Sequence, residues 1–222
     1  TGSGASDTVQ SVMDEKTNTK VAEWQSNTDS PTNAAREGMA LAKFFKGNQE
    51  SGAYMIWEAN GPGAIYGREV QEKEYWNFYY FRDQRTDGSI ATQRPGWYST
   101  KDGKRELLTD YQNAIECDPP LLINYSKDSI AQLSYYVYGK NGSVVHSASE
   151  AAKSPDEKGT NHGDNVIADA IMWKGLIELL GKVPDNKTDD EEIEYTPKVA
   201  EQNTLAYRHK QYRNELEEAE QW

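Results

Sequence analysis

The chain has 222 residues, enough for one well-packed domain with an appendage. Its formal net charge of -12 argues mildly against DNA binding, since phosphate contacts need lysine and arginine, although bound cations neutralise clustered carboxylates. No run of about 18 apolar residues and no amino-terminal leader pattern occur, so neither a membrane span nor a signal peptide is expected. The lone Cys117 excludes an internal disulfide and fits a reducing compartment.

The start of the chain predicts a β-hairpin followed by a helix. Residues 8–13 and 20–25 are β-rich runs separated by a polar turn. Ser30 and Pro31 then provide a helix cap and a first helical residue. The helix is expected to run to about Lys46, with its apolar side chains on one buried face.

A continuous apolar run, residues 53–57, predicts a strand covered on both faces. Glu58 follows it directly, and open α/β sheets place their ligand crevice at the carboxyl ends of strands. An ionised glutamate there is costly unless it is paired or bound to a metal. Glu58 is therefore a candidate metal ligand, and the alternative is a strand-end glutamate that faces water.

The middle of the chain predicts short alternating elements. In order, they are a helix at 64–73, a strand at 77–82, a polar loop at 83–98, a helix at 101–116, an extended piece at 123–125, a helix at 128–136, a strand at 144–146 and a loop at 149–161. Arg82, Lys104 and Arg105 are candidate contacts to DNA phosphates, although a solvated surface explains these basic residues equally well.

Residues 162–180 predict a long helix with a broad apolar face. Asp164, in its first turn, gains from the helix dipole, and it can also hold a cation beside Glu58. His162 either ligates a metal or packs at the helix entry. Asp169 lies about 140° around the helix from Asp164, so it is expected to be polar support within the packed face, with metal ligation as its alternative role.

The composition changes after Gly181, where an acidic stretch without a core pattern begins. We therefore expect one domain over 1–181 and an acidic tail or strap over 182–222. The order of elements predicts an α/β three-layer fold with a mixed central sheet flanked by helices. No Walker A motif, zinc-ligand spacing or Gly-x-Ser-x-Gly elbow is present.

Three segments resemble the nuclease domain of phage large terminase subunits. They are residues 55–63 (MIWEANGPG), residues 96–108 with their Gly-Trp-Tyr and Lys-Arg-Glu-Leu-Leu, and residues 162–170 (HGDNVIADA). The likeness spans about residues 5–181. It implies a ribonuclease H-like fold and an endonuclease that cuts concatemeric double-stranded DNA with two Mg²⁺ or Mn²⁺ ions. It also implies a terminase ATPase domain in cis, portal, small terminase subunit and prohead as partners, and the host cytoplasm during phage assembly.

Carried over, the resemblance makes Glu58 the second catalytic acid and Asp164 the third, both metal ligands. The first acid of the family lies on a strand before a Gly-rich stretch similar to residues 1–4, so no residue of this sequence takes its role and weak or absent activity is expected. Two other readings remain. One is a non-catalytic packaging-motor module that docks to portal or capsid, and the other is a different ribonuclease H-like nuclease, such as a resolvase.

Overall fold

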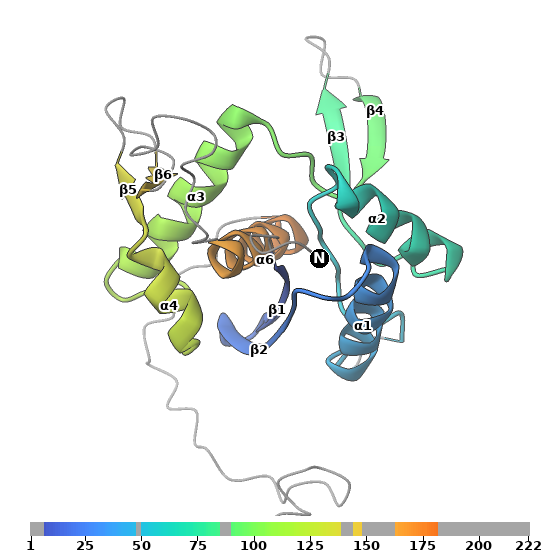
Figure 1. The fold of residues 1–222 in the computed structure, drawn as a ribbon, viewed down its shortest axis with the longest axis horizontal. Coiled ribbons are helices and arrows are strands. Elements are labelled where there is room, and N and C mark those ends of the chain that lie inside the picture. Colours follow the sequence, from blue (N-terminus) through green and yellow to red (C-terminus); the bar gives the residue numbers. More distant parts are fainter. Residues whose placement is uncertain (1–6, 48–49, 85–89, 139–143, 148–162, 182–222) are drawn as a thin grey trace, which may run out of the picture. The chain divides into compact units, whose positions relative to one another are not determined.

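The computed structural model describes residues 7–47, 50–84, 90–138, 144–147 and 163–181, with backbone alone for 82–84, 90–92, 138, 144 and 145. Figure 1 shows the arrangement of the elements. In chain order they are β1 (Thr8–Asp14), β2 (Thr19–Ser26), α1 (Pro31–Phe44), α2 (Pro62–Glu72), β3 (Tyr80–Gln84), β4 (Ile90–Pro95), α3 (Lys101–Glu116), α4 (Lys127–Leu133), β5 (Tyr136–Tyr138), β6 (Val144–His146) and α6 (Asp164–Leu180).

The strands form small antiparallel pairs, β1–β2, β3–β4 and β5–β6. Single parallel bridges join further segments, including Met55 with Phe78, Glu58 with Trp97 and Thr19 with Ile123. The α/β fold class is thus confirmed, whereas the expected mixed central sheet is fragmented among the described residues. The run 53–58 is extended, but it contributes isolated bridges instead of a ladder, and a cavity separates it from β1.

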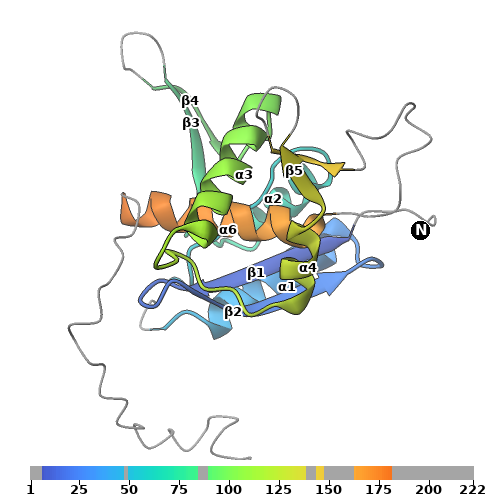
Figure 2. The ribbon, with the colours of Figure 1, turned by 90° about the vertical axis from the view of Figure 1, so that its left-hand side faces the viewer.

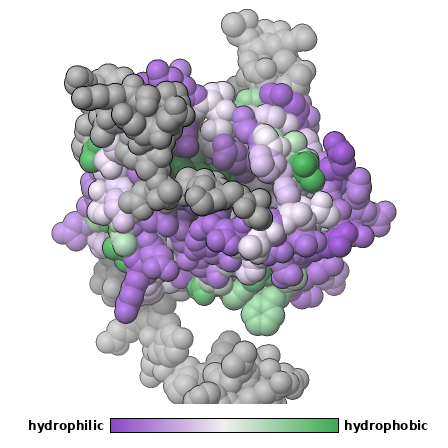
Figure 3. Space-filling view, viewed as in Figure 1, coloured by the Kyte–Doolittle hydropathy of each residue, from purple (hydrophilic) through white to green (hydrophobic). Residues whose placement is uncertain are grey.

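Helix α6 lies at the centre of the fold, with the β1–β2 hairpin along one side and α3 and α4 along another (Figures 1 and 2). A helix that is apolar around most of its circumference is expected to be buried, and α6 is. One hydrophobic cluster joins α6 to α3, and a second joins α1, α2 and residues 55–59. The face seen in Figure 3 is largely hydrophilic, in keeping with a sequence in which 36% of residues are hydrophobic.

Several predicted elements are confirmed. The hairpin forms, α3 spans the expected residues, and the Ser30 side chain caps α1 by accepting a hydrogen bond from the Asn33 amide. The prediction of a polar loop at 83–98 is wrong for β4, because residues 90–95 pair with β3. The helix expected to reach residue 136 ends at Leu133, because β5 pairs with β6.

The loop at 149–161 and the acidic tail at 182–222 lie outside the described residues, so the domain edge near residue 182 stays a prediction. In the described part of the chain, no helix is both long enough and apolar enough to cross a membrane.

Candidate metal site and its support

A cavity of about 1170 Å³ lies between β1, residues 53–58, α1 and α6. Both predicted carboxylates, Glu58 and Asp164, line it, although they are far apart in sequence. The rest of the lining is mainly apolar, with Ala34 and Ala42 from α1 and Ile171 from α6. The two candidate ligands therefore line one shared space, which Asp7, Asp14 and Glu15 line as well.

Glu58 is held by the backbone around it. The Trp97 amide donates to the carbonyl of Trp57 at 2.8 Å, and the Ala59 amide donates to the carbonyl of Trp97 at 2.7 Å. A side chain at Gly63 would overlap the Glu58 carbonyl, so only glycine lets α2 begin this close to the strand end. Gly63 and the pairing with Trp97 thus fix the position of the half-buried Glu58.

Asp164 is the first residue of α6. Its Oδ2 accepts a hydrogen bond from the Asp7 amide at 2.8 Å, which ties the helix end to the start of β1. Gly163, the residue before it, provides no side-chain cap. Negative charge at a helix amino terminus interacts favourably with the helix dipole.

Asp169 lies in the protein interior and not on the cavity. It is 0% exposed, and its Oδ1 is 2.7 Å from the Nζ of Lys20 and accepts a hydrogen bond from Ser11 at 2.5 Å. Its Oδ2 accepts hydrogen bonds from Asn124 at 2.8 Å and from Tyr111 at 3.2 Å. This position matches the expected polar support within the packed face, and it leaves the carboxylate no free approach for a metal.

The same lysine also contacts Glu23 and Ser129. Lys20 forms an ion pair with Glu23 and donates to the Ser129 hydroxyl at 2.8 Å. Burial raises the pKa of Glu23, but hydrogen bonds from Lys20 and Ser129 and the lysine charge outweigh it, so the pKa lies below its usual range. Burial and the nearby Asp169 charge raise the pKa of Tyr111, which keeps this phenol protonated. We call Lys20, Glu23, Tyr111, Asn124, Ser129 and Asp169 the ion-pair network.

Among the other predicted residues with described side chains, Lys104 and Arg105 do not line the cavity. Lys104 and Arg105 are exposed on α3, and Arg105 lies 3.4 Å from Asp102 of the same helix. Arg82 belongs to β3, but its side chain lies outside the described part, as does the whole of His162. Arg94 stacks on the ring of Tyr98 at 4.1 Å, so an aromatic contact already engages this cation.

Sequence reasoning missed Lys20 and Asp7. A lysine in a β-rich run carries no signal that its ammonium group is buried, since lysine is usually exposed. Asp7 lines the cavity, and its amide holds Asp164. Over the described residues, no group of three or more His, Cys, Asp or Glu side chains is arranged to hold a metal. Glu58 and Asp164 are thus not part of such a group.

The fold is similar to that of a solved phage nuclease. The crystal structure of the large terminase nuclease from thermophilic phage G20c matches with a TM-score of 0.50 and 15% identity, over 78% of this chain and 77% of that one. The same nuclease with bound cobalt matches with the same TM-score, identity and coverage, and with bound magnesium the TM-score is 0.49. No family profile and no curated protein matches the sequence. The chain therefore resembles terminase nucleases in fold.

Proposed function

We propose that the chain is a divalent-metal-dependent endonuclease domain of a phage DNA-packaging terminase, with a ribonuclease H-like arrangement of its elements. The observation that carries the proposal is that Glu58 and Asp164, far apart in sequence, both line one cavity. The fold similarity to a large terminase nuclease, solved also with bound cobalt, supports it.

The donor chemistry suits a hard divalent cation. Carboxylate oxygens are the ligands that Mg²⁺ and Mn²⁺ prefer, and Glu58 and Asp164 are the residues that would hold the metal. Two such ions, when bound, activate a water molecule and stabilise the charge on the scissile phosphate. Within the chain, the Asp7 amide orients the Asp164 carboxylate, and the Trp57–Trp97 backbone pairing fixes Glu58. Asp169 is a buried counter-ion of Lys20 in this proposal.

The experiment compares manganese-dependent nicking of supercoiled plasmid by the unmodified chain, Glu58→Gln and Asp164→Asn. The exposed Glu72→Gln on α2 is the matched control, because it makes the same chemical change outside the cavity. We expect the site variants to lose at least about tenfold in rate and the control to keep its activity. Calorimetric Mn²⁺ titration provides a second readout, in which the two site variants bind more weakly. Equal nicking and equal Mn²⁺ binding by all four proteins would contradict the proposal.

Double-stranded DNA would be held by exposed cations, and Lys104 and Arg105 are our candidates. Each phosphate contact that is lost lowers the slope of log affinity against log salt by roughly one. Lys104→Ala and Arg105→Ala should therefore weaken binding to all duplex sequences alike, each with a shallower salt dependence. Arg82 is proposed as a third contact. The ATPase domain in cis, portal, small terminase subunit and prohead are the proposed partners, in the host cytoplasm.

A non-catalytic packaging module is the second candidate. Two observations favour it, namely the net charge of -12 and, over the described residues, the lack of any group of three or more His, Cys, Asp or Glu side chains arranged to hold a metal. Pull-down of portal protein with and without residues 182–222 tests this role, and retention of portal by a chain without nicking activity would support it. A third candidate is a resolvase-like nuclease. Preferential cutting of branched DNA over linear duplex DNA would distinguish it from the first two candidates.

A further inference from the structure

Helix α6 begins without a side-chain cap of its own. The first N–H groups of an α-helix have no acceptor within the helix, and the side chain of the preceding residue usually supplies one. Here that residue is Gly163, which has no side chain to offer. A Cβ at Gly163 would overlap the ring and the hydroxyl group of Tyr136, and the same hydroxyl group donates to the Gly163 carbonyl at 3.2 Å. Tyr136 thus leaves room for glycine alone, so a side-chain cap has to come from another element.

Gln132, in the last turn of α4, supplies the missing acceptor. Its Oε1 accepts a hydrogen bond from the Asn165 amide at 3.0 Å, and its Nε2 donates to the Oδ1 of Asn165 at 2.7 Å. A backbone N–H can only donate, so the carbonyl end of the Gln132 side chain has to face it. Asn165 is the second residue of α6, where a capping side chain ordinarily binds, and it is 0% exposed. Gln132 therefore caps α6 from a different helix.

Gln132 is the last of three polar side chains spaced three residues apart at α4. Ser126 and Ser129 come before it, and residues three apart lie on one face of a helix. The hydroxyl groups of Ser126 and Ser129 both donate to the Glu23 carboxylate of β2, at 3.3 Å and 3.0 Å. Helix α4 packs beside α6 (Figures 1 and 2). One end of α4 is thus anchored on β2 and the other end on the start of α6.

Asp164 lies between Gly163 and Asn165, the two residues that this part of the chain holds. Its backbone is therefore held by residues 132–136, whereas its carboxylate accepts a hydrogen bond from the Asp7 amide of β1. Without the cap, the first turn of α6 would fray, because its N–H groups have no acceptors within the helix. Fraying would displace Asp164 relative to the opposite wall of the cavity, and a displacement of about 1 Å is enough to weaken a functional site strongly.

We propose that Gln132 is a positioning residue, which holds Asp164 in place for a divalent cation by capping α6. This role rests on the proposed function, because it acts through Asp164. Residues that orient a metal ligand without touching the cation typically contribute about tenfold or more to metal affinity. Gln132 itself does not line the cavity, so an uncharged replacement changes neither a ligand nor the charge of the site.

The test compares Mn²⁺ binding by the full chain and by Gln132→Met. Methionine keeps the approximate length of the side chain but removes both hydrogen bonds with Asn165. Ser30→Ala is the matched control, because it removes the side-chain cap of α1 and leaves α6 unchanged. We expect calorimetric titration to show at least about tenfold weaker binding for Gln132→Met and unchanged binding for Ser30→Ala. A merely structural role for Gln132 would destabilise both variants without separating their Mn²⁺ affinities.

Amide hydrogen exchange, followed by NMR in the metal-free chain, tests the cap directly. An amide in the first turn of a helix exchanges fast when it has no acceptor. We expect the Asn165 amide to be protected in the unmodified chain and in Gln132→Glu, which keeps an acceptor oxygen. In Gln132→Met it should exchange at least about tenfold faster, which is the effect of losing one or two net hydrogen bonds.

Three results would each overturn the role of Gln132. They are equal Mn²⁺ affinity of Gln132→Met and the unmodified chain, an equally weakened affinity of Ser30→Ala, and an unprotected Asn165 amide in the unmodified chain. The last measurement needs no variant, so it decides even if Gln132→Met fails to fold. Absence of Mn²⁺ binding by the unmodified chain would contradict the proposed function and with it the role in cation binding, whereas exchange at Asn165 would still show whether Gln132 caps α6.

Discussion

The regions that carry the two carboxylates are stabilised in different ways. Around α6 and the β1–β2 hairpin, the interior contains the ion-pair network centred on Lys20 and Asp169. Around α1, α2 and residues 55–59, it contains Trp57, packed against other aromatic rings and against the backbone at Gly67 and Gly96. We call the second set the Trp57 cluster. The first region positions Asp164 and the second positions Glu58, so the proposed site combines two independent supports.

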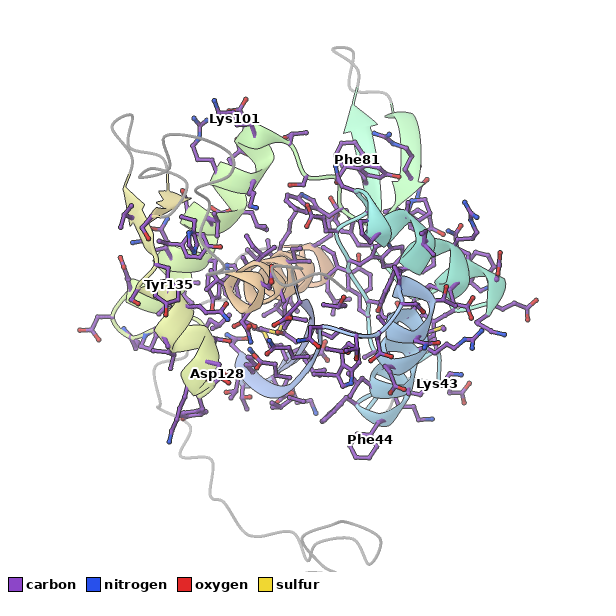
Figure 4. All side chains as sticks on the ribbon, viewed as in Figure 1. Lys43, Phe44, Phe81, Lys101, Asp128 and Tyr135 are labelled. Carbon is purple, nitrogen blue, oxygen red and sulfur yellow. The ribbon has the colours of Figure 1, made fainter. Side chains whose placement is uncertain are left out.

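The two supports differ in how they specify geometry. A buried charge tolerates few arrangements, because every lone pair and proton left without a partner costs free energy. The indole ring of Trp57 lies against Gly67 and Gly96. Its position is fixed by shape alone, because a side-chain atom added at either glycine would overlap the ring. Phe44, at the outer end of α1 in Figure 4, is a contrasting case. Its apolar side chain is 77% exposed, so it does little to fix the position of the helix.

The largest predicted effect is the removal of one partner from the ion-pair network. Asp169→Ala leaves the Lys20 ammonium group buried with Glu23 as its remaining anion, and Lys20→Met leaves Asp169 uncompensated. Each should lower the free energy of unfolding by about 3–5 kcal/mol, measured by urea denaturation.

The matched control is the double variant Lys20→Met with Asp169→Leu, which removes both charges. It should cost clearly less than the sum of the single variants, because neither charge is left alone. Additive losses would show that Lys20 and Asp169 do not act as a pair.

The second prediction concerns the Trp57 cluster. A Cβ at Gly67 would lie 2.8 Å from the Trp57 ring, at both Cζ2 and Nε1. Gly67→Ala should therefore destabilise the protein by about 1–3 kcal/mol despite the better helix propensity of alanine.

Adding Trp57→Phe to Gly67→Ala tests the cause, because the smaller ring makes room for the new methyl group. The double variant should lose less stability than the two single changes together, and thermal unfolding measures this. If Gly67→Ala alone is neutral or stabilising, α2 shifts freely and the cluster does not fix Glu58 by shape.

The sequence predicts the Trp57 cluster better than the ion-pair network, for a physical reason. Local signals suffice for the apolar run ending at Glu58, the Ser30 cap and the long α6, because periodicity and capping depend on neighbouring residues. The burial of Lys20, the assembly of the ion-pair network from five segments and the division of the sheet into pairs depend on contacts between distant residues. The strand β4 was missed because its polar sequence, IATQRP, forms a strand only by pairing with β3.

The third prediction compares helix caps in the two regions. The Ser30 hydroxyl accepts from the Asn33 amide at 3.2 Å, and the Ser126 hydroxyl accepts from the Ser129 amide at 3.3 Å. Ser126 also donates to Glu23 at 3.3 Å, which links its cap to the ion-pair network. We expect Ser30→Ala to cost about 1 kcal/mol and Ser126→Ala to cost more, by urea denaturation. A larger loss of unfolding free energy for Ser30→Ala would mean that the hydrogen bond from Ser126 to Glu23 adds little stability.

The smallest predicted effect is a pH dependence that belongs to the ion-pair network. The pKa of Glu23 is lower in the folded chain than its ordinary value of 4.5, because the Lys20 and Ser129 contacts outweigh burial. A carboxyl with a lowered folded pKa contributes stability that is present above its unfolded pKa and lost as the pH falls through the folded pKa. Unfolding free energies measured from about pH 6 down to about pH 3 should therefore fall less steeply for Glu23→Gln than for the unmodified chain. Parallel curves for the two proteins would show that the ammonium group of Lys20 is balanced by Asp169 alone, and that Glu23 lies beside the network without contributing to it.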